Sequence, residues 1–224
     1  MPGMDGTGLL FRDFAHFLRA EVQHDVVRYP PSDVLGYDEL LQRVTVPDGD
    51  IAIVAESFSG PLAIRLAARL GERVRALVLV ATFARPPSLL VAPAALCGSL
   101  IFRVPPPRAA LRTFLLGPDS SDVEVDALRR VIRGVAPAVM AKRLREIAEV
   151  DVRHHLDTIR CPVLYLRGSR DRVVTESSVD DIRAGLPALA VETVDAPHLV
   201  LQRRPEETGR LVSEFVLSSG GRDG

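Results

Sequence analysis

Short continuous hydrophobic runs alternate along this chain with segments whose hydrophobic residues recur every three or four positions. The continuous runs predict strands buried on both faces, at 50–54, 74–82, 161–166 and 189–194. Helical periodicity follows the first of these runs up to about residue 71 and returns from residue 205 onward. Strands and helices that alternate in this way predict an α/β fold with a doubly wound, mostly parallel sheet.

The N-terminal region predicts two further helices and one further strand. Over 9–22 one helical face is polar and the other is apolar, the apolar side chains being Leu10, Phe14, Phe17 and Leu18. The run 26–29 predicts a short strand that two prolines end. The segment 37–44 fits a helix capped by Asp33 or Gly36.

The alternation stops between residues 84 and 161, where proline, alanine and leucine are frequent. Two helical patterns occur there, at 122–135 and 139–150, with Pro137 between them. We therefore expect a helical cap inserted into the α/β core. The expected parts are the N-terminal core at 1–84, the cap at 85–156 and the C-terminal core at 157–224.

Length and charge narrow the class of protein. A chain of 224 residues with 47% hydrophobic and 25% charged residues is typical of one globular domain. The net charge of −1 gives no field that would favour nucleic acid or an anionic membrane, and the arginines are scattered. Neither a signal peptide nor a run long enough to span a bilayer is visible, so we expect a cytoplasmic protein.

The two cysteines, Cys97 and Cys161, lie far apart, fit no metal spacing and make no disulfide framework. We expect both to be buried apolar side chains in a reducing compartment. The glycines at 3, 6 and 8 have neither dinucleotide-binding spacing nor the Lys-Ser/Thr pair of a P-loop. We therefore expect no metal site and no cofactor.

The most informative motif is Ala55-Glu56-Ser57-Phe58-Ser59-Gly60, directly after the strand at 50–54. A serine on a sharp strand-to-helix turn needs small residues two positions before and after it, because the strand and the helix otherwise cannot approach closely. Ala55 and Ser59 meet this requirement, so Ser57 is the candidate nucleophile. The alternative is that Ser57 only caps the helix.

A candidate acid and a candidate base occur later in the chain. Asp171 follows the strand at 161–166, and His198 follows the strand at 189–194. Ser57, Asp171 and His198 would then all lie at the C-terminal ends of strands, where parallel α/β sheets form active sites. Their order along the chain is that of the α/β hydrolases and not of the other serine-hydrolase folds.

Other polar residues near these positions have competing explanations. Asp195 is the rival acid, but it precedes His198 too closely to reach the edge of the imidazole easily. Asp171 could instead cap the helix after its strand, and Glu56 could only shape the turn. The remaining histidines are expected at the surface or in structural positions: His16, His24, His154 and His155.

Strand order, serine turn, acid turn and histidine turn together resemble the α/β-hydrolase superfamily over nearly the whole chain. The opening segment Pro2-Gly3-Met4-Asp5-Gly6-Thr7-Gly8 looks like the oxyanion loop of that family. The resemblance implies that the backbone N–H groups of Met4 and Phe58 form the oxyanion hole. It also implies a core in which the first strands are missing here, because the family has three strands before this loop.

The missing third strand belongs beside the strand at 50–54, so its backbone partners would lack hydrogen bonds. Two explanations are open. The coding sequence could start upstream of Met1, which we expect, and the upstream DNA would test this. Alternatively, the strand at 26–29 could pair directly with the one at 50–54. If the chain begins at Met1, Met4 is less firmly anchored.

These residues imply a serine hydrolase that cleaves carboxylic esters or thioesters of a small apolar acyl substrate through an acyl-enzyme. The apolar segments 89–91 and 100–102 either line the acyl pocket or only pack the cap onto the sheet. A non-catalytic or weakly active binding protein of the same fold is one alternative. An acyltransferase, a peptidase or a C–C hydrolase with the same triad is another. Ester or thioester, acyl chain length and oligomeric state are left open by the sequence.

Overall fold

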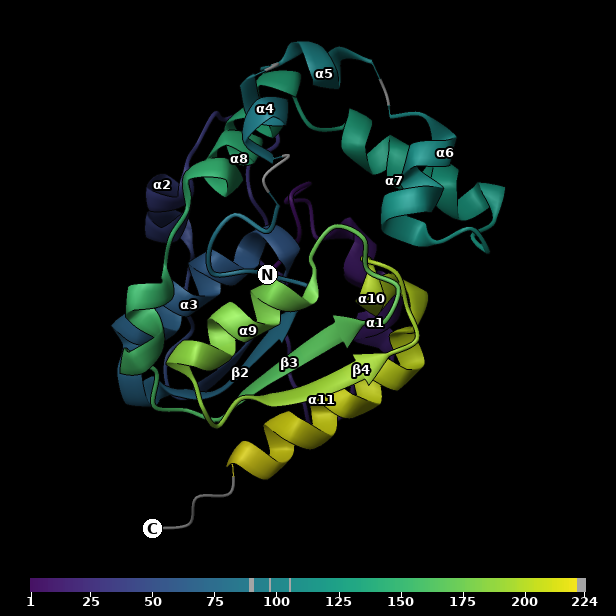
Figure 1. Cartoon of the computed structure of the whole chain (residues 1–224). Coiled ribbons are helices and arrows are strands. Elements are labelled where there is room, and N and C mark those ends of the chain that lie inside the picture. The colour runs from purple at the N-terminus through teal and green to yellow at the C-terminus, as the bar shows by residue number, and fades with distance from the viewer. Residues whose placement is uncertain (89–90, 97, 105, 221–224) are drawn as a thin grey trace.

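The computed structural model describes residues 1–88, 91–96, 98–104 and 106–220. Within them, four parallel strands form one sheet in the order β1-β2-β3-β4 (Figure 1). The strands are β1 (Ile51–Glu56), β2 (Val74–Val80), β3 (Val163–Gly168) and β4 (Ala190–Val194). Each coincides with one of the four continuous hydrophobic runs. The two central strands, β2 and β3, are almost wholly buried, as strands covered on both faces must be.

Helices cover both faces of this sheet, which confirms the doubly wound arrangement. One hydrophobic cluster lies under α2 (Tyr37–Arg43), α3 (Gly60–Leu70) and α9 (Glu176–Gly185). A second cluster on the opposite face lies under α1 (Arg12–His16), α10 (Val200–Arg203) and α11 (Pro205–Gly220). Figure 1 shows α9 and α11 on opposite sides of the strands. Short 3₁₀ turns are η1 (Leu9–Phe11), η2 (Ser57–Ser59), η3 (Gly71–Arg73) and η5 (Arg153–Thr158).

A run of helices separates β2 from β3 and stands above the core in Figure 1. It comprises α4 (Val91–Leu96), α5 (Leu100–Arg103), α6 (Arg108–Leu111), the π-helix η4 (Arg112–Leu116), α7 (Asp122–Arg133) and α8 (Pro137–Glu149). Ser121 caps α7 through a capping box with Glu124. Pro137 opens α8, where a missing N–H costs little. The boundaries of 85 and 156 for a separate cap stay a prediction.

The role of the apolar segments 89–91 and 100–102 in lining an acyl pocket stays a prediction. Leu100 and Ile101 are exposed, whereas Phe102 packs against Val139 and Met140 of α8. Residues 89–90 lie outside the described part of the chain, and so does Cys97. Cys161 is half-buried and not fully buried as expected.

The predicted helix over 9–22 is wrong in its length. The chain forms η1 and α1 and leaves the helix after His16, and Phe17, predicted to face inward, is 41% exposed. The cause is a contact with α11. A Cβ on Gly209 would lie 2.7 Å from the carbonyl oxygen of Phe17, and the N–H of Arg19 donates to Ser213 Oγ at 3.0 Å. This crossing of backbones turns the chain out of the helix.

The predicted strand at 26–29 is also wrong, because this segment pairs with no strand among the described residues. Met1 pairs with β1 instead: its amino group donates to the Val54 carbonyl at 2.6 Å, and its carbonyl accepts from the N–H of Glu56 at 3.1 Å. Met1, Val26, Val27 and residues of β1 line one groove of about 490 Å³. Pairing of the 26–29 segment with β1 is therefore excluded, while the upstream start stays a prediction.

Candidate active site

Ser57 lies where β1 ends and the chain turns sharply into α3. Its φ of 50° is in the left-handed region, which is rare for a residue with a side chain and costs on the order of 1–3 kcal/mol. Such strain is held in place by the surrounding packing. The helix cap of α3 is Ser59, without a side-chain cap bond, so the structure does not support the alternative that Ser57 only caps the helix.

Close contact between α3 and the segment that follows β2 holds this turn. A Cβ on Gly60 would lie 1.8 Å from Thr82 Oγ1, so only glycine fits there. Thr82 Oγ1 donates to the Ser57 carbonyl at 2.5 Å. The Tyr165 hydroxyl in turn donates to the Thr82 carbonyl at 2.7 Å and accepts from its N–H at 2.9 Å. The strained serine is thus tied to the two central strands.

The three residues expected from the sequence come together in one hydrogen-bonded chain. His198 Nε2 lies 3.0 Å from Ser57 Oγ, and His198 Nδ1 lies 2.8 Å from Asp171 Oδ2. The side chains of His198 and Asp171 are 4% and 3% exposed, whereas Ser57 is half-buried. With the proton on Nδ1 facing the carboxylate, the bare Nε2 faces the serine hydroxyl and can accept its proton.

Asp171 is held by backbone N–H groups of its own loop. Asp171 follows β3, and its Oδ1 accepts from the N–H groups of Val173 and Val174 at 2.8 and 3.0 Å, which leaves Oδ2 for the imidazole. Burial lowers the pKa of His198, but the negative charge and hydrogen bond of Asp171 and the charge of Glu56 outweigh it. The net pKa of His198 is therefore raised above 6.5.

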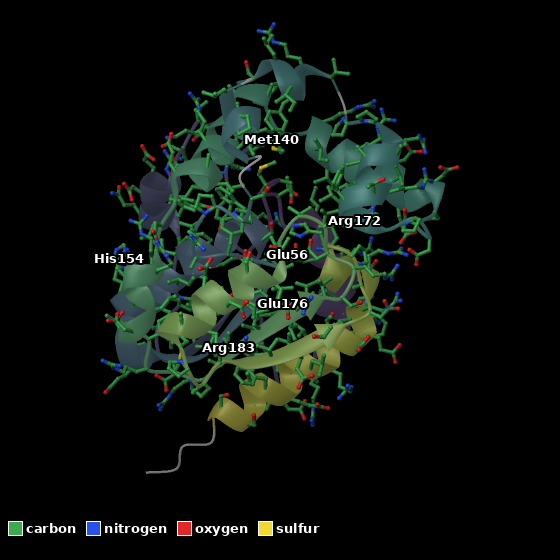
Figure 2. All side chains as sticks on the ribbon, viewed as in Figure 1. Glu56, Met140, His154, Arg172, Glu176 and Arg183 are labelled. Atoms are coloured by element: carbon green, nitrogen blue, oxygen red, sulfur yellow. The ribbon has the colours of Figure 1, made fainter. Side chains whose placement is uncertain are left out.

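The competing residues lie elsewhere. Asp195, the rival acid, is paired with Arg170, whose Nε donates to its Oδ1 at 2.8 Å. The rings of His154 and His155 lie against each other outside the core, tilted by 41° with centroids 4.1 Å apart, and Figure 2 shows His154 at the edge of the molecule. His16 and His24 are exposed.

The loop that begins with Pro2 is held at nearly every carbonyl. The hydroxyl of Ser59 donates to the Pro2 carbonyl and lies 2.6 Å from the Tyr29 hydroxyl. The Gly3 carbonyl accepts from Gly6 N–H at 3.0 Å, and the Gly6 carbonyl accepts from Tyr29 N–H at 2.7 Å. Within the described residues the N–H of Met4 has no acceptor. The N–H of Phe58, in the first turn after β1, is likewise available.

Glu56 does more than shape the turn, which the sequence did not indicate. It is 2% exposed, and its Oε2 accepts from Gln202 Nε2 at 3.1 Å, which links the serine turn to α10 after His198. Its Oε1 has no partner among the described residues. Burial raises the pKa of Glu56 to about 7, against the Gln202 hydrogen bond and the charge of His198, which lower it.

Two residues of this region, Gln202 and Arg143, are not predicted by the sequence analysis. Nothing marks Gln202 before the structure is known. Arg143 does carry a signal, because it falls on the apolar stripe of α8 with Val139, Met140 and Ile147. A charged residue on a buried helical face needs a polar partner. Met140 projects from α8 toward the core in Figure 2, on the side where Glu56 lies.

The described residues contain no group of three His, Cys, Asp or Glu side chains that could hold a metal ion. Among the same residues, no helix combines the length and hydropathy that a membrane crossing requires.

Comparison with known proteins agrees with the α/β fold described above. A family model described as the alpha/beta hydrolase family matches residues 1–211. The chain therefore belongs to the alpha/beta hydrolase family and is a hydrolase.

Individual relatives are more distant. The chain is 33% identical to 3-oxoadipate enol-lactonase 1 of Acinetobacter baylyi over 78 residues, which are 35% of this chain and only 29% of that protein. The enol-lactonase structure from Burkholderia xenovorans has a TM-score of 0.77 at 18% identity, over 96% of this chain and 88% of the other. An esterase from Exiguobacterium antarcticum has a TM-score of 0.79 at 13% identity, over 97% and 90%. These structural likenesses show the fold.

Proposed function

We propose that this hydrolase cleaves carboxylic ester or thioester bonds of a small apolar acyl substrate. The observation that carries the proposal is the hydrogen-bonded chain from Ser57 through His198 to Asp171. A serine, an imidazole with one free nitrogen and a buried carboxylate in that sequence form an activated nucleophile.

In the first half of the reaction, Ser57 Oγ attacks the carbonyl carbon while its proton passes to His198 Nε2. The carbonyl π bond opens to an oxyanion, which the N–H groups of Met4 and Phe58 stabilise. The carbonyl re-forms, the bond to the alcohol or thiol breaks, and His198 returns the proton to the leaving group. Asp171 stabilises the imidazolium while it carries the proton.

In the second half, His198 takes a proton from water, whose oxygen attacks the acyl carbon of the Ser57 ester. Collapse of the second oxyanion breaks the bond to Ser57 Oγ, which regains the proton, and the free acid leaves. An apolar acyl group is supported by the cluster of Val139 and Met140 that packs against Met4. Since relatives of this chain carry the name enol-lactonase, and a lactone is a cyclic ester, lactones belong among the substrates to test.

Hydrolysis of a panel of chromogenic acyl esters, acyl thioesters and lactones of graded length tests this proposal. Wild type should hydrolyse short acyl esters, and Ser57→Ala should reduce kcat by at least about 10³. Ser177→Ala, at an exposed serine, is the matched control and should retain full activity. A Ser57→Ala protein with most of the wild-type rate would refute the assignment. The most reactive member of the panel decides between ester, thioester and lactone.

A further inference from the structure

The loop that carries Met4 is bound by a residue of the helical insertion, Arg143 of α8. Its Nη1 donates to the carbonyls of Met4 and Asp5 at 2.9 and 2.8 Å, and its Nη2 donates to the Pro30 carbonyl at 3.0 Å. One guanidinium therefore fixes the two peptide groups that follow Met4 and ties them to the segment after Tyr29.

The same guanidinium also lies against the other side of the expected oxyanion hole. Arg143 Cζ is 6.0 Å from the ring centroid of Phe58 and 5.6 Å from that of Tyr29, within the range of cation–π contact. The two residues whose N–H groups would bind the oxyanion, Met4 and Phe58, are thus both in contact with one side chain. That side chain comes from neither of their loops.

The loop makes room for this contact. Gly6 has a φ of 72°, and a Cβ there would lie 2.6 Å from Arg143 Nη1 and 2.9 Å from Tyr29 Cβ. A side chain at position 6 would therefore push the guanidinium away. Glycine serves both the left-handed backbone and the close approach of the arginine.

Arg143 is a buried cation, and it contributes little to the stability of the fold. It is 1% exposed, no carboxylate lies within ion-pair distance among the described residues, and its buried Nε has no partner there. Burial lowers its pKa, although the guanidinium stays protonated at neutral pH. A buried cation without an ion pair contributes less stability than a well-packed apolar side chain of the same volume. The cost indicates a role beyond packing.

We propose that Arg143 is a positioning residue that holds the Met4 loop so that the N–H groups of Met4 and Phe58 converge on the substrate oxyanion. The helical insertion then contributes to turnover through this side chain, without contact with the reacting atoms. This inference rests on the proposed ester hydrolysis. Because the oxyanion forms only in the transition state, loss of Arg143 should lower kcat and leave KM nearly unchanged.

This role is tested by measuring kcat and KM with the best ester of the substrate panel. The variants are Arg143→Met, Arg143→Lys and the control Arg145→Met. Arg145 is exposed on the same helix. Arg143→Met should lower kcat by roughly 10²-fold with KM within about threefold, as for a lost oxyanion donor. Arg143→Lys should recover only part, since one ammonium nitrogen cannot replace both Nη1, which binds the Met4 and Asp5 carbonyls, and Nη2, which binds the Pro30 carbonyl. Arg145→Met should match wild type.

Rescue by a small molecule separates positioning from folding. In Arg143→Gly, guanidinium ion at millimolar, non-denaturing concentration should raise kcat at least about tenfold by occupying the vacated site, and it should leave Arg145→Gly unchanged. If Arg143→Met does not fold, the kcat of Arg143→Lys and the guanidinium rescue of Arg143→Gly test the inference instead. If folded Arg143 variants keep the wild-type kcat, or if guanidinium does not raise the kcat of Arg143→Gly, the role of Arg143 is refuted and the proposed function still stands. A wild type that is inactive and not labelled at Ser57 would overturn the proposed function and this inference with it.

Discussion

The Nε2 atom of His198 lies 3.0 Å from the Oγ atom of Ser57, although 141 positions separate the two residues in the chain. Parallel strands bring them together. Ser57 follows β1 and His198 follows β4, and all four strands end at the same edge of the sheet. The strain at Ser57, where φ is 50°, aims its hydroxyl out of the sheet toward the imidazole.

The carboxylate of Asp171 should matter for activity far more than that of Asp195. In Asp171→Asn the amide can donate to His198 Nδ1, which favours the wrong tautomer and protonates the nitrogen that faces Ser57. By analogy with serine-protease triads, kcat should fall by about 10⁴. Asp195→Asn is the control, since Asp195 contacts Arg170 instead, and should stay within about threefold of wild type. Equal losses in both variants would contradict this assignment.

The pH profile of kcat/KM should show a single acid limb from His198. Only the neutral imidazole accepts the serine proton, so activity falls as the pH drops through the pKa of His198, which lies above 6.5. The charge of Glu56 is one of the causes that raise this pKa. In Glu56→Gln the limb should therefore move to lower pH. A limb that disappears in Glu56→Gln would assign it to Glu56 instead.

Glu56 should also make the stability of the fold depend on pH. Its pKa is about 7 when folded and 4.5 when exposed, so the folded state binds the proton more tightly. Its contribution is therefore greatest below pH 4.5, declines as the pH rises to about 7, and is constant above that.

Urea unfolding from pH 5 to 8 measures this effect. Wild type should lose on the order of 1–3 kcal/mol relative to Glu56→Gln over the interval, at 1.36 kcal/mol per pKa unit. Glu72→Gln, at an exposed carboxylate, should run parallel to wild type. Parallel curves for wild type and Glu56→Gln would show that Glu56 ionises normally in the folded protein.

The contact between Gly60 and Thr82 should limit what the serine turn tolerates. In Gly60→Ala the new methyl would overlap Thr82 Oγ1, which holds the Ser57 carbonyl. Overpacking of this kind costs about 1–3 kcal/mol, and the thermal midpoint should fall accordingly. Gly220→Ala, where a Cβ meets nothing within 4 Å, is the control and should leave the midpoint unchanged or slightly higher. A Gly60→Ala protein as stable as wild type would mean that the turn relaxes freely.

The local sequence pattern predicts those features of the fold that are determined by residues close together in the chain. Continuous apolar runs marked all four strands, and small residues around Ser57 marked the turn. Features set by distant contacts were not visible. The segment 26–29 has strand composition, but a strand needs a partner beside it, and the edge of β1 there borders a groove. The first helix ends early because Phe17 meets Gly209, which no periodicity near Phe17 records.

The same limit applies to the site. The order of Ser57, Asp171 and His198 followed from the residues after each strand. Arg143 and Gln202 reach the site from other elements, and their partners are backbone carbonyls and a buried carboxylate. Contacts of this kind depend on how the helices pack, so sequence could place Arg143 on a buried face without naming its partner.

Covalent labelling with a fluorophosphonate, followed by intact-mass and peptide mass spectrometry, tests the central claim most directly. The reagent reacts with a serine only where a base and an oxyanion site activate it. We expect one adduct per chain, on Ser57, formed much more slowly in His198→Ala and absent from Ser57→Ala. No adduct on the folded wild type, or an adduct that persists in Ser57→Ala, would contradict the account.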